Sequence, residues 1–165
     1  MSTSEKSSKI ILITNDGKEF EVKKFVVRES ELLAHVVDVC KEENKIPLFE
    51  VDGPTLQKVI EFCSHYENEP SYDMPSDEDL EYSTLSKPEK WLANFFKMSN
   101  EDLTKLIFAA EYLQMDRLID STCYILSYRA NGKTVEELRE MFGIVNDFDD
   151  EKDEYLEPEY FWYIF

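Results

Sequence analysis

Cys63 and His65 are the two side chains whose types and spacing come nearest to a reactive or metal-binding site. A thiolate beside an imidazole acts as nucleophile and base in some hydrolases, and both groups bind zinc. The spacing Cys-x-His supplies only two ligands, whereas a structural zinc ion takes four. The second histidine of the chain, His35, belongs to a different predicted helix. The sequence therefore predicts no metal centre, no cofactor and no nucleophilic active site.

Carboxylates are abundant, and five of them lie within residues 147–153. An EF-hand calcium loop needs a glycine at its turn and a glutamate at its last position, and this run has neither. No glycine-rich phosphate loop is present, since the chain contains only four glycines. We interpret the run as solvated charge and the protein as a non-enzyme. The five residues are Asp147, Asp149, Asp150, Glu151 and Asp153.

The overall charge indicates which kinds of binding partner this chain is not expected to have. Acidic residues outnumber basic ones by 36 to 18 in 165 residues, which gives a formal charge of −18. Such a chain is repelled by phosphate backbones and anionic lipids, so we expect no nucleic-acid partner and no membrane partner. The three cysteines, Cys40, Cys63 and Cys123, form no Cys-x-x-Cys pair and are expected to be buried thiols. This pattern favours a cytoplasmic and nuclear location.

Three helix patterns between residues 99 and 148 are the elements that must position any functional surface. The first helix is expected from about residue 101 to 114, with Ser99 as its N-cap. The second is expected to begin after Asp116 as N-cap and to stop at Asn131-Gly132. The third, residues 135–142, follows a capping box formed by Thr134 and Glu137 and ends at Gly143.

The first of these helices is predicted to be apolar on two faces. Five residues at helical spacing form the expected core stripe, and Phe108, Tyr112 and Met115 cluster on the opposite side. A helix of this kind contacts something besides its own core. The core stripe consists of Leu103, Leu106, Ile107, Ala110 and Leu113.

The remaining segments predict a small sheet with helices, an α+β fold. Residues 9–22 read as a hairpin around Asn15-Asp16-Gly17, and residues 46–51 as a third strand. Further helices are expected at residues 32–40 and 56–63, and after Pro88 as the first helical position. Arg28-Glu29-Ser30 reads as a polar break. Residues 1–8 and the acidic loop 67–86 are expected to be flexible.

Several separated blocks of this sequence, in the same order, resemble the S-phase-kinase-associated protein family, the adaptor subunit of Skp–cullin–F-box (SCF) ubiquitin ligases. The resemblance implies a BTB/POZ domain over residues 9–130, extended by C-terminal F-box-binding helices over 131–165. The implied function is a non-catalytic adaptor that links a cullin to F-box substrate receptors for ubiquitin-dependent degradation. The blocks are LITNDGKEFEV (12–22), IPLFEVDGPTLQKVIEFCSHYENEP (46–70), AAEYL (109–113), DSTC (120–123) and GKTVEELREMFGIVNDF (132–148).

The same resemblance implies two sets of contact residues. On the cullin side, the family's Asn-Tyr pair falls on Glu111-Tyr112, next to Phe108. Glutamate in place of asparagine adds a charge to that interface, which bears on cullin affinity or cullin choice. On the F-box side the resemblance assigns Ile119, Cys123, Leu126, Phe142, Ile144, Asn146 and Trp162.

The placement of the C-terminal tail and two alternative functions stay open from the sequence. The last eleven residues are rich in aromatic side chains, from Tyr155 to Phe165, and either fold back onto the third helix or are buried by a partner. A self-associating BTB/POZ protein, a homodimer when unpartnered, would use this tail and the face of Phe108, Tyr112 and Met115. An Elongin-C-like adaptor is a further alternative, although that family lacks the segment after about residue 130.

Overall fold

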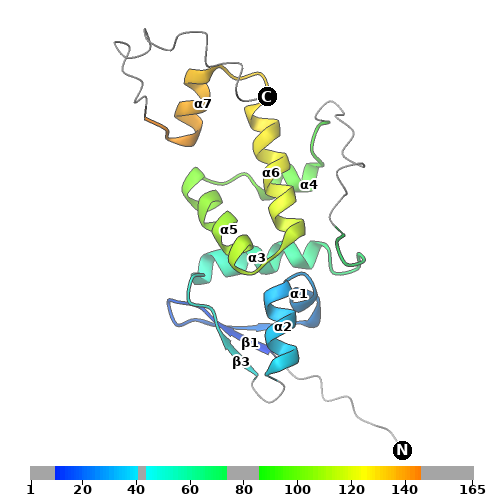
Figure 1. The fold of residues 1–165 in the computed structure, drawn as a ribbon. Helices are drawn as coiled ribbons and strands as arrows, with labels where there is room; N and C mark the ends of the chain where they lie inside the picture. The colour runs from blue at the N-terminus through cyan, green and yellow to red at the C-terminus, as the bar shows by residue number, and fades with distance from the viewer. Residues whose placement is uncertain (1–9, 41–43, 74–85, 146–165) are drawn as a thin grey trace, which may run out of the picture. The chain divides into compact units, whose positions relative to one another are not determined.

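The computed structural model describes residues 10–40, 44–73 and 86–145. The chain divides into two compact units, Met1–Asn131 and Gly132–Phe165. The first unit combines a three-stranded sheet with helices, so the predicted α+β class is confirmed (Figure 1). Its elements are β1 (Ile10–Ile13), β2 (Glu19–Val22), α1 (Lys24–Arg28), α2 (Glu31–Val39), β3 (Lys45–Pro47), α3 (Gly53–His65), α4 (Lys90–Phe95), α5 (Asn100–Tyr112) and α6 (Asp116–Ala130). The second unit contains α7 (Val135–Phe142).

The sheet has the strand order β2-β1-β3. The predicted hairpin is confirmed: β1 and β2 are antiparallel, with Ile10 opposite Val22. β3 runs parallel to β1, with Leu12 opposite Ile46, so the chain must cross over between them through α1 and α2. The central strand buries Leu12 completely.

The hairpin turn is joined to the start of α3 by Asp16. Its Oδ1 accepts a hydrogen bond from the backbone N–H of Gly53 at 3.0 Å, and its Oδ2 lies 2.8 Å from Lys18 Nζ. Hydrogen bonds from Lys18 and Thr14 lower the pKa of Asp16 to about 2. Asp52 caps α3 by accepting from Thr55 N at 2.8 Å. The turn residue and the helix cap together place α3 against the sheet.

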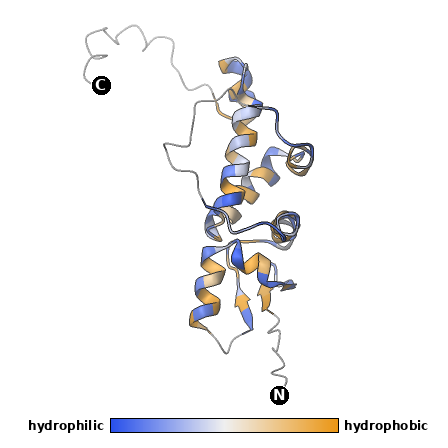
Figure 2. Ribbon diagram, turned by 90° about the vertical axis from the view of Figure 1, so that its right-hand side faces the viewer, coloured by the Kyte–Doolittle hydropathy of each residue, from blue (hydrophilic) through white to orange (hydrophobic). Residues whose placement is uncertain are grey.

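The core of the first unit is built from the inner faces of the sheet and helices. Figure 2 shows apolar (orange) and polar (blue) residues mixed along the helices and strands, as expected for elements with one buried face. The largest fully buried side chains are Phe62, Phe96, Leu12, Leu33, Leu48, Leu56, Leu106, Leu113, Met115, Leu118, Val26 and Val51.

The predicted break at residues 28–30 is present but begins only at Glu29, and the expectation for Pro88 is wrong. Residues 24–28 form the helix α1, and the predicted polar break after it is buried, with Glu29 9% and Ser30 0% exposed. Both side chains find partners inside the protein, which local sequence does not reveal. Pro88 is not the first residue of a helix, because α4 begins at Lys90.

The end of α5 departs most from the predicted pattern. Gln114 adopts the left-handed conformation (φ 52°) just after the helix. Gln114 N donates to Glu111 O at 3.0 Å and Met115 N to Ala110 O at 2.9 Å, which is the Schellman arrangement. This turn directs Met115 into the core, where it is 1% exposed. The prediction that Met115 lies on a second exposed face is therefore wrong, and Met115 rather than Asp116 occupies the N-cap position of α6.

Gln114→Gly is expected to raise the free energy of unfolding by about 0.5–1 kcal/mol. A left-handed backbone strains a residue that carries Cβ, and glycine removes this strain at some entropic cost in the unfolded chain. Gln114→Ala, which keeps Cβ, is the control and should show no gain. Urea denaturation measures both values, and a destabilised glycine variant would contradict the assignment of strain to this residue.

In the second unit, α7 confirms its predicted signals. Thr134 Oγ1 accepts from Glu137 N, and the Glu137 carboxylate accepts from Thr134 N at 2.8 Å, forming the capping box. Gly143 is left-handed (φ 66°), and Ile144 N donates to Arg139 O at 2.8 Å. The helix therefore begins and ends where the sequence predicts.

Candidate functional site

The Cys63–His65 pair is not arranged for chemistry. Cys63 is fully buried, and burial raises the pKa of its thiol to about 12. The His65 ring stacks on Trp91, with centroids 3.6 Å apart and planes at 3°. Within residues 10–40, 44–73 and 86–145, no three His, Cys, Asp or Glu side chains are grouped to hold a metal ion. Both residues of the pair thus serve packing.

The other two cysteines contradict the expectation of buried thiols. Cys40 lies at the end of α2 and Cys123 on α6, and both are exposed and unpaired. Cys123 is exposed because its neighbours Thr122 and Ile125, rather than Cys123 itself, lie on the inner face of α6.

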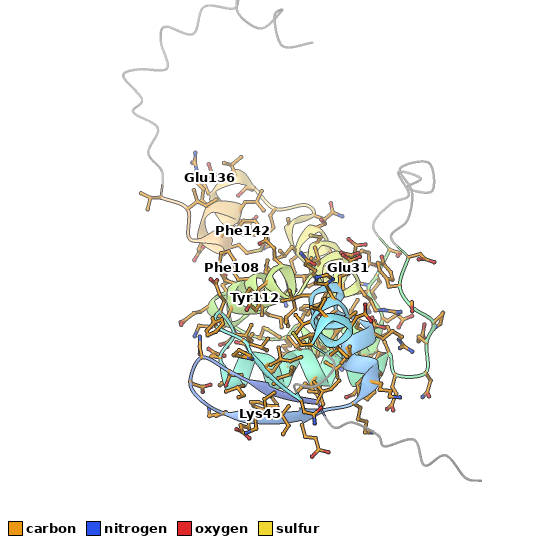
Figure 3. All side chains as sticks on the ribbon, turned by 60° about the horizontal axis from the view of Figure 1, so that its bottom comes forward. Glu31, Lys45, Phe108, Tyr112, Glu136 and Phe142 are labelled. Carbon is orange, nitrogen blue, oxygen red and sulfur yellow. The ribbon has the colours of Figure 1, made fainter. Side chains whose placement is uncertain are left out.

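The outer face of α5 carries the residues predicted for the cullin side. Phe108 is 64% exposed, Glu111 is exposed and Tyr112 is half-buried. Figure 3 labels Phe108 and Tyr112, which lie one helical turn apart and therefore on the same side of α5. The inner face is occupied by Leu106 and Ala110. The structure thus brings the three predicted residues together on one accessible surface, which we call the α5 face.

A hollow of about 390 Å³ adjoins Phe108. Its lining includes Lys105 from α5 and Glu50 from the segment after β3. Phe49, the neighbour of Glu50 in the chain, is 74% exposed. The strand predicted for residues 46–51 ends at Pro47, so Phe49 lies outside it and strand alternation does not determine its exposure. Phe49 therefore adds a second exposed aromatic ring in the chain segment that borders the hollow.

The outer face of α6 carries three of the residues predicted for the F-box side. Ile119, Cys123 and Leu126 are four and three residues apart, so they form one stripe along the helix. Cys123 is exposed, and the other two are half-buried. We call this stripe the α6 face.

Polar bonds and apolar packing position α6 from the opposite side. Leu118 and Ile125 are buried, and Thr122 Oγ1 donates to Leu118 O at 2.7 Å within the helix. Near the helix end, the guanidinium of Arg129 donates to the carbonyl of Phe96, the residue that follows α4. These contacts leave the α6 face pointing outward.

Phe142 and Ile144, predicted for the F-box side, lie in the second unit. The side chain of Phe142 is 48% exposed and that of Ile144 is 58% exposed. Val135 and Val145, in the same unit, are also exposed. Val135 was not predicted as a contact residue, although its spacing of seven from Phe142 places both on one side of α7. The second unit thus carries its own exposed apolar surface. Asn146, Trp162, the aromatic tail and the acidic run 147–153 lie outside the described residues.

Among the described residues, no helix combines the length and the hydropathy needed to cross a bilayer.

Comparison with known proteins gives a consistent result over nearly the whole chain. Residues 8–68 match the profile described as the Skp1 family tetramerisation domain, and residues 116–163 match the Skp1 family dimerisation domain. SKP1-like protein 1A of Arabidopsis thaliana is 37% identical over 163 residues, covering 94% of this chain and 97% of the relative. Suppressor of kinetochore protein 1 of Schizosaccharomyces pombe is 31% identical over 156 residues, with the same coverage.

The relatives and the fold agree. SKP1-like protein 1 of Oryza sativa is 34% identical over 169 residues, covering 93% of each chain. The small sheet with its helices is the POZ-like α+β arrangement of this family. The chain belongs to the Skp1 family.

Proposed function

We propose that this chain is a non-catalytic adaptor of an SCF-type ubiquitin ligase. In this proposal the α5 face binds a cullin, and the α6 face and the second unit bind the F-box of a substrate receptor. Family membership supports the general role. The single observation that carries the finer assignment is that adjacent helices of one unit present two separate outward surfaces, the α5 face and the α6 face.

The chemistry of the two faces supports different partners. The α5 face combines aromatic rings with the carboxylate of Glu111, so its partner should present an apolar pocket with a basic group nearby. The α6 face is a narrow stripe of Ile119, Cys123 and Leu126, which suits the apolar side of a partner helix. Aromatic and aliphatic side chains of this kind supply most of the affinity at interfaces.

Charge substitutions on each face should separate the two associations. Phe108→Glu is expected to weaken binding of a cullin N-terminal domain by more than about 30-fold and to leave F-box binding within about twofold. Cys123→Glu is expected to do the reverse, because a carboxylate on either apolar surface must be desolvated on binding. Isothermal titration calorimetry with the purified domains measures both affinities.

Val39→Glu is the matched control, since Val39 is an exposed apolar residue on α2 and belongs to neither face. It should leave both affinities unchanged. If Phe108→Glu and Cys123→Glu bind both partners as tightly as the unaltered chain, the assignment of the two faces is wrong.

Self-association is a second candidate function. The descriptions of the matched family domains, tetramerisation and dimerisation, favour it, as does the exposed apolar surface of α7. Sedimentation velocity of the free chain, compared with its F-box complex, distinguishes the two. Oligomers that persist unchanged in the presence of a saturating F-box domain would favour self-association through a separate surface.

A further inference from the structure

The α5 face and the α6 face are joined by a very short connection. α5 ends at Tyr112 and α6 begins at Asp116, so only residues 113–115 lie between the helices. Any rotation within these residues changes the angle between the two helices and therefore between the two faces. We call residues 113–115 the α5–α6 turn.

Three consecutive residues hold this turn: Glu29 and Ser30, which lie between α1 and α2, and Glu31, the first residue of α2. The hydroxyl of Ser30 donates to the carbonyl of Leu113. The backbone N–H of Glu31 donates to Gln114 O at 3.1 Å. The carboxylate of Glu29 accepts from Arg117 Nε, in the first turn of α6, at 2.9 Å. We call residues 29–31 the brace; Figure 3 labels Glu31, its last residue.

Two of the three residues of the brace, Glu29 and Ser30, are buried, whereas Glu31 is exposed. Ser30 is 0% exposed, and its hydroxyl also accepts from Leu33 N at 3.2 Å, so donor and acceptor are both used. The Glu29 side chain is 2% exposed. A rotation of the turn would break these bonds and leave buried polar groups unpaired, which is costly in a medium of low dielectric constant.

The end of α5 leaves two carbonyl groups that the brace binds. The carbonyls of Leu113 and Gln114 have no acceptor role within α5 or the Schellman turn, which uses the carbonyls of Ala110 and Glu111. Ser30 and Glu31 supply the missing donors. The strained Gln114 backbone also persists only where its surroundings hold it.

We propose that the brace is a positioning element that fixes the angle between the α5 face and the α6 face. The inference rests on the proposed function, because that function gives the two faces different partners. A fixed angle would hold the partner bound at the α5 face and the partner bound at the α6 face at a constant distance from each other. Group transfer between two bound parts is fast only when their geometry is maintained.

Glu31→Pro is the sharpest variant for a test. Glu31 is the first residue of α2, a position where proline is accepted, and Ser30 before it is already extended (φ −123°, ψ 116°). Proline removes the N–H that reaches Gln114, and its ring displaces that carbonyl. Glu31→Ala is the matched control, because it keeps the N–H and removes only the side chain.

Ser30→Ala provides a second, smaller change that adds no atoms. It removes the bond to Leu113 but also the N-cap of α2. Ser99→Ala, which removes the N-cap of α5 far along the helix from the turn, controls for the loss of a cap. Comparison of Ser30→Ala with Ser99→Ala distinguishes the effect of losing the bond to Leu113 from the effect of losing a helix cap.

The angle is measured on the free chain with nitroxide labels. Thr104→Cys on α5 and Ser127→Cys on α6 are exposed label positions in a Cys40→Ser, Cys123→Ser background. Cys63 stays unlabelled because it is buried and its pKa is about 12. Double electron–electron resonance measures the distance between the two labels. The distance distribution should be shifted and broader in Glu31→Pro, and broader in Ser30→Ala. It should be unchanged in the two controls, Glu31→Ala and Ser99→Ala.

The functional readout uses the chain without labels in a reconstituted ligase. Glu31→Pro should lower the rate of ubiquitin transfer while both partner affinities stay within about twofold. Distance distributions unchanged in Glu31→Pro and Ser30→Ala, or transfer rates that follow the affinities alone, would overturn the inference. Failure of the proposed function is a separate result, because it would show as absent cullin or F-box binding while the distances still change.

Discussion

Arg117→Met should lower the free energy of unfolding by about 3 kcal/mol, because it leaves the buried carboxylate of Glu29 without its main partner. The Glu29 side chain is 2% exposed and that of Arg117 is 10% exposed. Arg28 still lies 3.3 Å from the other carboxylate oxygen, which keeps the expected loss at the lower end for a buried pair. Urea denaturation followed by circular dichroism measures it.

The guanidinium of Arg117 makes more than one contact that methionine cannot replace. It donates to the carbonyl of Pro70 and lies over the rings of Tyr66 and Tyr72, at 4.6 and 5.2 Å from their centroids. Tyr72 in turn donates to Asp120 on α6 at 2.6 Å. Arg117 therefore joins α6 to the segment after α3 as well as to the brace.

A double variant distinguishes an unpaired charge from lost packing. Glu29→Met combined with Arg117→Met removes both charges, and it should recover about 2 kcal/mol of the loss. Lys58→Met is the control, since Lys58 and Glu61 form an exposed pair at 2.8 Å whose loss should cost less than about 1 kcal/mol. A double variant as unstable as the sum of the two single ones would show that the Glu29 charge is not the cause.

Local signals in the sequence predicted the elements whose stability is local. The capping box at Thr134 and the glycine at 143 define α7, and Ser99 caps α5 as expected. Asn15-Asp16-Gly17 places the hairpin. Each of these signals depends on neighbours within about four residues, which is why a sequence pattern can identify it.

The structural features that could not be predicted from the sequence depend on contacts between residues that are far apart in the chain. Glu29 and Ser30 read as a polar break because their partners, Arg117 and Leu113, lie more than 80 residues away. The left-handed conformation of Gln114, which usually marks glycine, changes the chain direction just after α5. Extending the helical spacing past this residue therefore assigned Met115 to the exposed face of the helix instead of the core. The brace cannot be predicted from helical or strand periodicity, because its hydrogen bonds join residues that are far apart in the sequence.

The candidate contact residues were predicted in a different way. Family resemblance selected Glu111 on α5 and Cys123 on α6, helical spacing selected Phe108, and the structure places each of them on an exposed helix face. Helical spacing identified the second apolar face of α5, whereas the cysteine pattern wrongly predicted that Cys123 is a buried thiol. Their roles as partner contacts remain predictions for the binding measurements above.

Phe62→Ala is expected to destabilise the first unit by about 4 kcal/mol. Phe62 lies on α3, is 1% exposed and forms the centre of an aromatic cluster. Its ring centroid is 4.9 Å from that of Tyr66, 5.5 Å from Phe95 and 6.1 Å from Trp91. Removing the ring leaves a cavity among side chains that are themselves held by stacking, so the site cannot collapse easily.

The loss should be concentrated in α4. This helix has six residues and no side-chain cap, so it depends on packing rather than on its own hydrogen bonds. Trp91 and Phe95, both on α4, contact Phe62 directly. Hydrogen exchange of the α4 amides should therefore accelerate in Phe62→Ala more than exchange of the β1 amides, and equal acceleration of both would indicate global unfolding instead.

The same cluster links stability to the α6 face. Phe96 follows α4, and its carbonyl accepts from Arg129 near the end of α6, so a loosened α4 removes one of the bonds that position this helix. Phe62→Leu, which fills most of the cavity, should cost about 1.5 kcal/mol, and Phe49→Ala at an exposed site less than about 0.5 kcal/mol. If Phe62→Ala weakens F-box binding while Phe62→Leu does not, α4 acts on the α6 face through Arg129. If Phe62→Ala and Phe62→Leu both bind the F-box as tightly as the unaltered chain, the position of α6 does not depend on α4.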